Sequence, residues 1–286
     1  MRILRYETIE FELREDGIGI LTLNRPKRMN AISVQFVEDM NSLFDDLMIN
    51  LDCRIVIMRG TLEGKAFCAG LDIKEAPLLG GRRVPEAFKK LKHIDVPELV
   101  KRTLYWQNRM AQIVIKMRKT SQPIIALIHG PATGGGFTFA MAADIRLASE
   151  AGRFSIGAIN IGMSGGDLGG GYFLPRLIGM SRAADLMYTG RYLGAEEAEK
   201  IGFVLKVVEK DKLLDSALEL AGEMLTKSPL GLRMTKEAIN MTFDTPSLET
   251  MINLDNRGQT LCTTSKDFTT SMQAFIEKKE PKFPLR

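Results

Sequence analysis

The chain has 286 residues, of which 45% are hydrophobic and 26% are charged. This composition is typical of a folded globular protein rather than a disordered chain, and the length allows one large core or one core with an appendage. The formal charge of +4 is small and no basic run is interleaved with aromatic residues, so nucleic-acid binding is not expected.

Cysteine and histidine usage argues against disulfides and metal centres. The three cysteines, Cys53, Cys68 and Cys262, lie far apart, and the two histidines, His93 and His129, do not form a ligand constellation. No apolar run reaches the roughly 20 residues of a membrane span, and the charged first residues do not resemble a secretory signal. We therefore expect a cytoplasmic protein with no metal ion and no membrane contact.

The first two thirds of the chain alternates predicted strands with predicted helices. Short β-prone runs bounded by turn residues indicate strands, and apolar residues three and four apart indicate helices. Strands are expected at 17–25, 53–60, 122–130 and 144–149, and helices at 33–48 and 134–143. Ser33 is expected to cap the first helix. This order predicts an α/β fold with crossover helices.

The rest of the chain is predicted to be mainly helical. A long charged segment, Ala76–Gln122, interrupts the alternation, and its second part is expected to form a helix after Pro97. Helical patterns then occupy 181–190, 195–202, 211–228, 229–243 and 247–261, with one strand expected at 203–209. The C-terminal third therefore reads as a helical subdomain.

Two glycine-rich turns follow predicted strands and can expose backbone N–H groups. One is Lys65–Glu75, and the other contains Gly134, Gly135 and Gly136 before a predicted helix. N–H groups at a helix start lack internal partners, so the two turns can together bind one carbonyl oxygen. Tight strand-helix packing alone would also explain the glycines. Cys68, which has no histidine partner, is expected to be a packed side chain rather than a nucleophile.

One carboxylate, Asp167, stands in the glycine-rich loop "IGMSGGDLGGGYFLPRLIG" at 161–179. Glycine contributes no apolar surface, so side-chain packing does not explain such a loop. Asp167 either hydrogen-bonds nearby backbone in a solvated turn or points at a ligand that the backbone approaches closely. The local residues leave both interpretations open.

Five segments together resemble the crotonase superfamily, also called the enoyl-CoA hydratase/isomerase family. They are, in chain order, "NRPKRMNAI", "KAFCAGLDIKE", "GPATGGGFTFAMAADIRLAS", "FLPRLIGMSRAADLMYTGR" and "AEEAEKIGFVLKVV". The resemblance implies a core of ββα turns coiled into a superhelix, expected over 1–200, and C-terminal helices that serve trimer assembly, expected over 201–286. It also implies an acyl-CoA ligand and a homotrimer, or a hexamer made of two trimers.

The resemblance assigns roles to individual residues. Leu71 and Gly135 match the oxyanion-hole positions of the family, so their N–H groups are expected to bind the thioester oxygen. Five further residues match positions that contact the nucleotide and pantetheine part of coenzyme A: Lys27, Arg28, Ala69, Ile73 and Lys74. Lys278 resembles a C-terminal lysine that reaches the CoA phosphates across a subunit interface. No cofactor is expected beyond coenzyme A as part of the substrate.

The sequence departs from the family at two positions that are expected to line the substrate site. Enoyl-CoA hydratases place two glutamates around a catalytic water, and here those positions are Thr138 and Ala158, neither of which can act as a general base. Asp167 aligns with the catalytic aspartate of members that shift double bonds. The resemblance therefore favours double-bond isomerisation, with Asp167 as the base, over ordinary hydration.

Two other functions stay open. As a runner-up, Asp167 can instead serve a hydrolase that cleaves a C–C bond of a cyclic or β-keto acyl-CoA. The chain can also be a non-catalytic acyl-CoA-binding homologue that has lost both glutamates. The segment Ala76–Gln122 is expected to shape the acyl pocket, where Tyr105 and Trp106 would suit a bulky or cyclic acyl group. Packing of these aromatic side chains on a neighbouring surface is the alternative.

Overall fold

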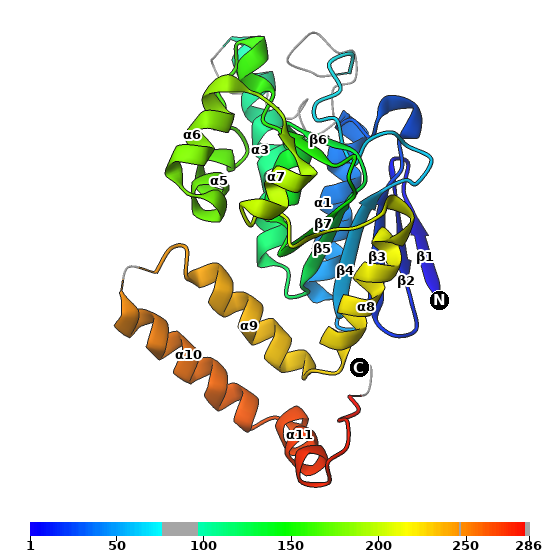
Figure 1. The fold of residues 1–286 in the computed structure, drawn as a ribbon, viewed down its shortest axis with the longest axis vertical. Helices are drawn as coiled ribbons and strands as arrows, with labels where there is room; N and C mark the ends of the chain where they lie inside the picture. The colour runs from blue at the N-terminus through cyan, green and yellow to red at the C-terminus, as the bar shows by residue number, and fades with distance from the viewer. Residues whose placement is uncertain (76–96, 246, 284–286) are drawn as a thin grey trace.

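A seven-stranded sheet lies at the centre of the computed structural model, which describes residues 1–75, 97–245 and 247–283 (Figure 1). The strands, in sheet order, are β1 (Arg2–Arg5), β2 (Ile9–Leu13), β3 (Ile18–Leu23), β4 (Ile55–Gly60), β5 (Ile124–Ile128), β7 (Ile145–Ala148) and β10 (Lys206–Val207). Neighbours from β3 to β10 are parallel, whereas β1, β2 and β3 pair antiparallel. The predicted α/β class is confirmed.

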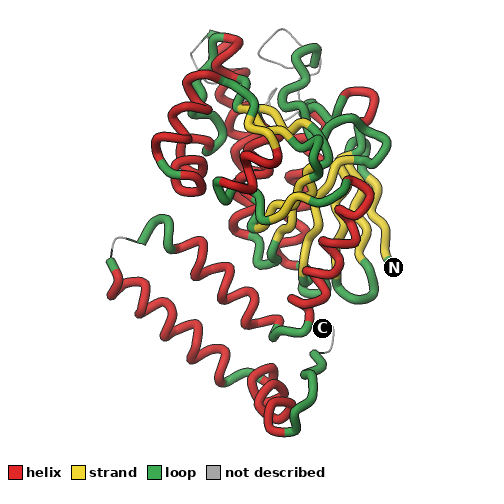
Figure 2. The backbone as a smooth tube through the Cα atoms, viewed as in Figure 1, coloured by secondary structure: helices red, strands yellow, loops and turns green. Residues whose placement is uncertain are grey.

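Helices cover both faces of this sheet, as Figure 2 shows. The helices of this part of the chain are α1 (Val34–Ile49), α3 (Glu98–Lys119), α4 (Gly135–Ala142), α5 (Gly170–Ile178), α6 (Met180–Thr189), α7 (Ala195–Lys200) and α8 (Leu213–Leu225). Successive strand residues point to opposite faces, so Val56 and Met58 join the core with α1, α3 and α4, while Ile55 and Ile57 pack with α8. A parallel sheet requires such covering, because both of its faces are apolar.

A second, three-stranded sheet supports the residues that follow β5. Its strands are β6 (Pro131–Thr133), β8 (Arg153–Ser155) and β9 (Leu193–Gly194). Phe154 of β8 packs edge-on against Phe203, with ring centroids 5.0 Å apart, and both contact Phe137 of α4. Because Phe203 belongs to this aromatic cluster, the strand predicted at 203–209 is shortened to β10.

Three further helices form what we call the extension: α9 (Pro229–Met241), α10 (Leu248–Thr263) and α11 (Lys266–Ile276). They lie apart from the sheet at the lower edge of Figure 1, and we call the rest of the chain the body. Ser228, Ser247 and Ser265 cap the three helices, each accepting a hydrogen bond from the backbone N–H three residues later. The described side chains of α10 and α11 include no buried residue.

One buried lysine ties the extension to the body. The ammonium of Lys236, on α9, donates to the carbonyl oxygens of Met117 and Gln122 and lies 3.0 Å from a carboxylate oxygen of Asp144. Burial lowers the pKa of Lys236, and the Asp144 carboxylate opposes that shift. The contact to Met117 holds α9 against the C-terminal end of α3.

Most predicted elements are present, and the differences have physical causes. Ser33 caps α1 as predicted, accepting a hydrogen bond from the Phe36 N–H at 3.2 Å. Helix α5 was not predicted, because it starts among glycines and contains Pro175. Helix α8 lies in the region predicted to be the C-terminal helical part, yet it packs on the central sheet. The division of the chain into 1–200 and 201–286 stays a prediction. No helix within the described ranges is long and apolar enough to cross a membrane.

Candidate active site

The two predicted glycine turns lie side by side. Cys68 of the first turn pairs with Ala132 as a parallel bridge, and its N–H donates to the Pro131 carbonyl oxygen at 3.2 Å. In return, the Thr133 N–H donates to the Cys68 carbonyl oxygen at 2.9 Å. Backbone hydrogen bonds therefore hold the first turn against the strand that leads into α4.

Glycine is required in these turns for two different reasons. Gly70 has φ +82° and Gly134 has φ +53°, both in the left-handed half of conformational space that other residues rarely adopt. A Cβ atom on Gly136 would lie 2.2 Å from the Cys68 carbonyl oxygen, so the helix can approach the first turn only without a side chain there. The glycines thus bring two stretches of backbone together around one point.

Leu71 and Gly135 both line one cavity of about 180 Å³. Gly135 is the first residue of α4, where an N–H has no acceptor inside the helix. Neither N–H has a hydrogen-bond partner among the residues that the structure describes. Two unpaired donors on a shared cavity can bind one oxygen that gains negative charge, although their role as an oxyanion hole stays a prediction.

Asp167 lines the same cavity. One of its carboxylate oxygens accepts the Leu168 N–H at 2.9 Å, and the side chain of Gln107, on α3, donates to the carboxylate. Burial raises the pKa of Asp167, and these two hydrogen bonds lower it. The carboxyl is therefore a better proton acceptor than an exposed aspartate while keeping partners that fix its direction.

The loop around Asp167 is a tight turn rather than a loose one. The Gly170 N–H donates to the Asp167 carbonyl oxygen at 2.7 Å, and Leu168 and Gly169 have φ of +47° and +89°. A Cβ atom on Gly165 would lie 2.8 Å from the Met187 carbonyl oxygen. The Asp167 carboxylate accepts a backbone N–H, as in the first interpretation, and also lines the cavity, as the second requires, so its direction toward a ligand stays a prediction.

Asp167 also lines a much smaller cavity of about 20 Å³. Thr138 and Ala158 line it together with Asp167, and Ala158 and Asp167 also line the larger cavity. Thr138 is 4% exposed, and its hydroxyl makes a long contact of 3.4 Å to the Gly134 carbonyl oxygen. This volume is enough for one water molecule, and the walls offer a carboxylate and a hydroxyl as partners.

Several residues of this site were not predicted. Besides Gln107, the larger cavity is lined by Met110 of α3 and by Ile156 and Met163. Trp106 is buried and lines the cavity too, so this aromatic side chain faces the site rather than a neighbouring surface. Helical periodicity marks Trp106 and Met110 as core-facing, but no local pattern marks Gln107 as a partner of a carboxylate 60 residues further along the chain.

The cysteines and histidines have structural surroundings. Burial raises the pKa of the Cys68 thiol to about 12, so a thiolate nucleophile does not form there at neutral pH. The ring of His129 contacts the Gly64 carbonyl oxygen at 3.1 Å, and burial lowers its pKa. His93 lies outside the described residues. Within the described ranges, no group of three or more His, Cys, Asp and Glu side chains could hold a metal ion.

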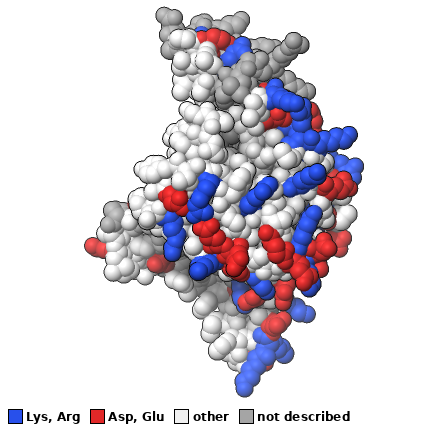
Figure 3. Space-filling model, turned by 45° about the horizontal axis from the view of Figure 1, so that its top comes forward, with Lys and Arg blue, Asp and Glu red and all other residues white. Residues whose placement is uncertain are grey.

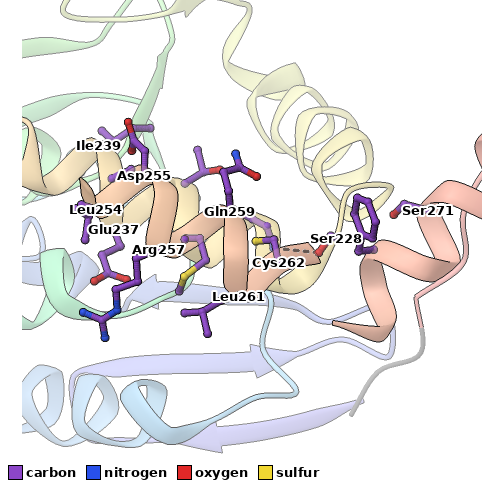
Figure 4. A pocket seen from close by; sticks show the side chains of 16 residues that line it. Ser228, Glu237, Ile239, Leu254, Asp255, Arg257, Gln259, Leu261, Cys262 and Ser271 are labelled. Carbon is purple, nitrogen blue, oxygen red and sulfur yellow. Dashed lines mark hydrogen bonds between the residues drawn. The ribbon is translucent and has the colours of Figure 1, made fainter. Parts of the chain in front are cut away.

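Another cavity, of about 600 Å³, lies within the extension (Figure 4). Its walls come from α9, α10 and α11, and include Glu237, Arg257 and Cys262. It contains none of the residues predicted to carry chemistry. On the face of the molecule shown in Figure 3, basic and acidic side chains are interspersed rather than gathered in a patch of one sign.

Comparison with known proteins identifies the family. A family model described as enoyl-CoA hydratase/isomerase matches residues 13–285. The chain belongs to the enoyl-CoA hydratase/isomerase family. A probable enoyl-CoA hydratase of Mycobacterium leprae, echA12, is 35% identical over 243 residues, which are 85% of this chain and 78% of that protein. YngF of Bacillus subtilis, a putative enoyl-CoA hydratase/isomerase, is 33% identical over 273 residues, or 96% of each chain.

Solved structures of the enoyl-CoA hydratase/isomerase family share the fold. A putative enoyl-CoA hydratase from Streptomyces coelicolor A3(2) has a TM-score of 0.85 at 30% identity and covers 100% of this chain and 97% of its own. An enoyl-CoA hydratase from Bacillus anthracis has a TM-score of 0.86 at 27% identity, covering 98% and 100%. The predicted family and the crotonase-like fold are confirmed.

The six residues predicted to contact coenzyme A differ in where they lie relative to the cavity. Ala69 and Ile73 line the cavity itself. Lys27 and Arg28 are exposed in a short 3-10 helix, η1 (Pro26–Arg28), and Lys74 is exposed in the first turn.

Hydrogen bonds and ion pairs hold η1 against the first turn. The Met29 carbonyl oxygen accepts the Ala69 N–H at 3.0 Å, and the guanidinium of Arg25 lies 3.0 Å from Asp72 and 3.2 Å from Glu75. The sixth predicted contact, Lys278, follows α11 in the extension and is not part of the cavity wall. Coenzyme A binding by all six stays a prediction for this member of the enoyl-CoA hydratase/isomerase family.

Proposed function

We propose that this chain is an enzyme that binds an acyl-CoA and shifts a carbon–carbon double bond of its acyl group through a thioester enolate. The observation that carries the proposal is the shared cavity, which joins two unpaired N–H groups, of Leu71 and Gly135, to one carboxylate, of Asp167. Membership of the enoyl-CoA hydratase/isomerase family supports an acyl-CoA as the ligand.

The two N–H groups would act on the thioester oxygen. Removing a proton beside the thioester carbonyl moves negative charge onto that oxygen, and fixed donors stabilise the enolate as it forms. In other enzymes one such donor contributes about 2.7–4 kcal/mol to the transition state. Because backbone hydrogen bonds fix both turns around Cys68, little reorganisation is needed when the charge develops.

Asp167 would act as the single base. Its carboxylate removes a proton from the carbon α or γ to the thioester carbonyl, the enolate delocalises, and the same carboxyl returns the proton at the other carbon. The reaction needs no second acid. Thr138 and Ala158 support this choice over ordinary hydration, because neither side chain can take the role of a glutamate that activates water.

The small cavity beside Asp167 favours a second candidate function. A water held there between the Thr138 hydroxyl and the Asp167 carboxylate could be deprotonated and attack a carbonyl group. On a cyclic or β-keto acyl-CoA, that attack would break the adjacent C–C bond. This reaction also uses the N–H groups of Leu71 and Gly135, since a carbanion stabilised as a thioester enolate leaves.

An acyl-CoA panel with mass spectrometry of the products tests these functions. Isomerisation leaves the substrate mass unchanged and, in deuterated water, washes deuterium into the acyl group. Hydration adds one water, and C–C hydrolysis adds water and divides the product. The expected result is a rearranged product of unchanged mass in ordinary water, with deuterium incorporated in deuterated water to the extent that the Asp167 carboxyl exchanges its proton before returning it. No reaction with any enoyl-, dienoyl- or β-keto-CoA would contradict the enzyme proposal.

Asp167→Asn separates an enzyme from an acyl-CoA-binding homologue without catalysis. Asparagine keeps the oxygen that accepts the Leu168 N–H, so the loop should keep its shape. Turnover should fall roughly 10²- to 10⁴-fold, because the base is lost, while acyl-CoA affinity should change little. Asp211→Asn, an exposed aspartate in η4 (Lys210–Lys212), is the matched control and should behave as wild type.

We also propose that the chain assembles as a homotrimer or as a hexamer of two trimers and needs no cofactor beyond the coenzyme A of its substrate. Large apolar side chains that a single chain leaves exposed on α10 and α11 support assembly, among them Leu248, Phe275 and Ile276. Exposed apolar groups of this kind mark contact surfaces. Light scattering of the purified protein measures the mass directly.

A further inference from the structure

Cationic side chains gather at the C-terminal end of α4, the helix whose first residue is Gly135. The guanidinium of Arg146 donates to two carbonyl oxygens at this end, at 2.7 and 3.2 Å, and that of Arg118 donates to a third, at 3.2 Å. The acceptors are, in that order, Ala143, Ala140 and Ala142. The last carbonyl groups of a helix have no partner inside it, so the two arginines complete the hydrogen bonding of α4.

The positive charge at this end of α4 is only partly neutralised. Asp144 lies 3.1 Å from Arg118 and 3.0 Å from Lys236, the buried lysine of the extension. Arg146 instead bonds carbonyl oxygens, including that of Phe203 at 2.6 Å. Burial lowers the pKa of Arg146 to about 10, with Asp144 opposing this shift, so the side chain is charged at neutral pH. Among the residues that the structure describes, one carboxylate therefore faces three cations.

Helix α4 joins these cations to the predicted oxyanion hole. It has eight residues, all of them buried, and is about 12 Å long. A helix carries about half a positive charge at its N-terminus and half a negative charge at its C-terminus. In so short a helix the negative end opposes the positive end at any oxygen bound to the Gly135 N–H. Cations at the negative end remove that opposition, and buried charges are screened only weakly.

We propose that Arg118 and Arg146 strengthen the oxyanion hole by neutralising the negative end of α4, so that the whole helix stabilises an enolate oxygen at the Gly135 N–H. The inference rests on the proposed function for the position of the enolate. Neither arginine lines the catalytic cavity, so both are positioning residues that act through α4. A neutral amide could donate to the same carbonyl oxygens without the cost of burying a charge, and the inference gives that charge a role.

Arg54 provides a matched control within the same chain. It is 8% exposed, as is Arg146, and it donates to the carbonyl oxygens of Leu225 and Lys227 at 3.2 and 3.0 Å. These oxygens lie at the C-terminal end of α8, and no residue of α8 lines the catalytic cavity. Arg54→Met and Arg146→Met therefore remove the same charge from the ends of two helices, of which only α4 begins at the cavity.

Ionisation of a bound β-keto acyl-CoA measures the oxyanion hole without turnover. The parent protein for this test carries Asp167→Asn and so lacks the proposed base. Acetoacetyl-CoA bound to it can lose its α proton to water, and the ultraviolet absorbance of the resulting enolate gives the ionised fraction. At a pH where the parent binds both forms, the ratio of bound enolate to bound neutral ligand reports how well the negative oxygen is stabilised.

Removal of one cation from the end of α4 should lower this ratio. A unit charge about one helix length away changes it roughly three- to tenfold at the effective dielectric constant of a protein. Arg146→Met and Arg118→Gln should each show a fall of this size. Arg146→Lys keeps the charge without the planar donor fork, and it should stay within about twofold of the parent, as should Arg54→Met.

A purely structural role would give a different pattern. Arg146→Met and Arg54→Met should both lower the free energy of unfolding, because each leaves carbonyl oxygens without a donor. A fall in the enolate ratio for Arg54→Met, or an equal fall for Arg146→Lys and Arg146→Met, would overturn the inference, since charge at α4 would not be the cause. If Arg146→Met does not fold, Arg118→Gln decides, because Arg118 is only partly buried, and an unchanged ratio in that variant overturns the inference.

The remaining outcomes distinguish this inference from the proposed function. Equal enolate ratios in every variant, with turnover of an acyl-CoA by the wild-type protein, would overturn the inference alone. No enolate on the parent at any pH would contradict the oxyanion hole and the inference with it. The expected changes in ratio without turnover by the wild-type protein would support the role of the arginines and contradict the proposed isomerisation.

Discussion

The body and the extension differ in what holds their side chains in place. In the body, backbone hydrogen bonds and close glycine contacts place Leu71, Gly135 and Asp167 around one cavity. In the extension, the described residues of α10 and α11 bury no side chain, and on α9 only Lys236 is buried. A site that must hold reacting atoms within a fraction of an ångström needs the fixed backbone of the body. The extension instead leaves its side chains exposed to other partners.

The largest expected effect comes from breaking the contact that builds the site. Gly136→Ala places a Cβ atom 2.2 Å from the Cys68 carbonyl oxygen, so α4 must move away from the first turn. We expect a loss of about 3 kcal/mol in the free energy of unfolding, as for overpacking of a core, with loss of turnover. Chemical denaturation and an acyl-CoA assay measure both.

A second glycine provides the matched control. Gly222 is exposed in α8, and a Cβ atom there would meet nothing within 4 Å. Gly222→Ala should stabilise the protein by about 0.5–1 kcal/mol, because alanine loses less backbone freedom in a helix. If the alanine at position 136 were tolerated as well as the one at 222, the close approach of the two turns would not be what forms the site.

The body also shows how far sequence reasoning reaches. Glycine triplets and a strand-to-helix transition are local patterns, so the two turns at Lys65–Glu75 and Gly134–Gly136 could be predicted and are found side by side. Gln107 could not be predicted, since its approach to Asp167 depends on how α3 lies across the sheet. Helix α5 was missed because Pro175 and the glycines before it argue locally against a helix.

The extension shows the complementary limit. Helical patterns predict α9 and α10 from the sequence, and the structure has them. The same residues do not say what covers the apolar side chains, because that depends on surfaces outside the local pattern. The tie through Lys236 to Asp144 joins residues almost a hundred positions apart, which no local signal encodes.

A smaller effect is expected from the hydrogen bond of Gln107 to Asp167. A base acts in its ionised form, so kcat/KM should fall as the pH drops through the pKa of Asp167, which burial raises above the ordinary value of about 3.9. Gln107→Leu removes a bond that favours the ionised carboxylate. The pKa should then rise further, and the acid limb of the profile should move to higher pH.

The pH profile separates this role from a structural one. Gln112→Leu changes the same residue type on α3 at a position that does not line the cavity, and its profile should match that of the wild type. A Gln107→Leu variant that loses rate equally at every pH would show that Gln107 shapes the pocket without acting on the ionisation of Asp167.

The smallest effect is expected for Lys278, through which the extension would contribute to a site formed by the body. Lys278 is exposed at the end of the extension, outside the cavity wall, and only assembly with another subunit could bring it to the phosphates of coenzyme A. An exposed ion pair contributes about 0.2–1 kcal/mol, so Lys278→Ala should raise KM by roughly two- to fivefold at low salt with kcat unchanged. The difference between this variant and the wild type should shrink as salt screens the charge.

Lys279→Ala, at a neighbouring lysine that pairs with Glu277 at 2.9 Å, is the control and should leave KM unchanged. Equal KM values for the two variants would mean that the extension does not contribute a charge to the bound nucleotide, and the body alone would then form the binding site.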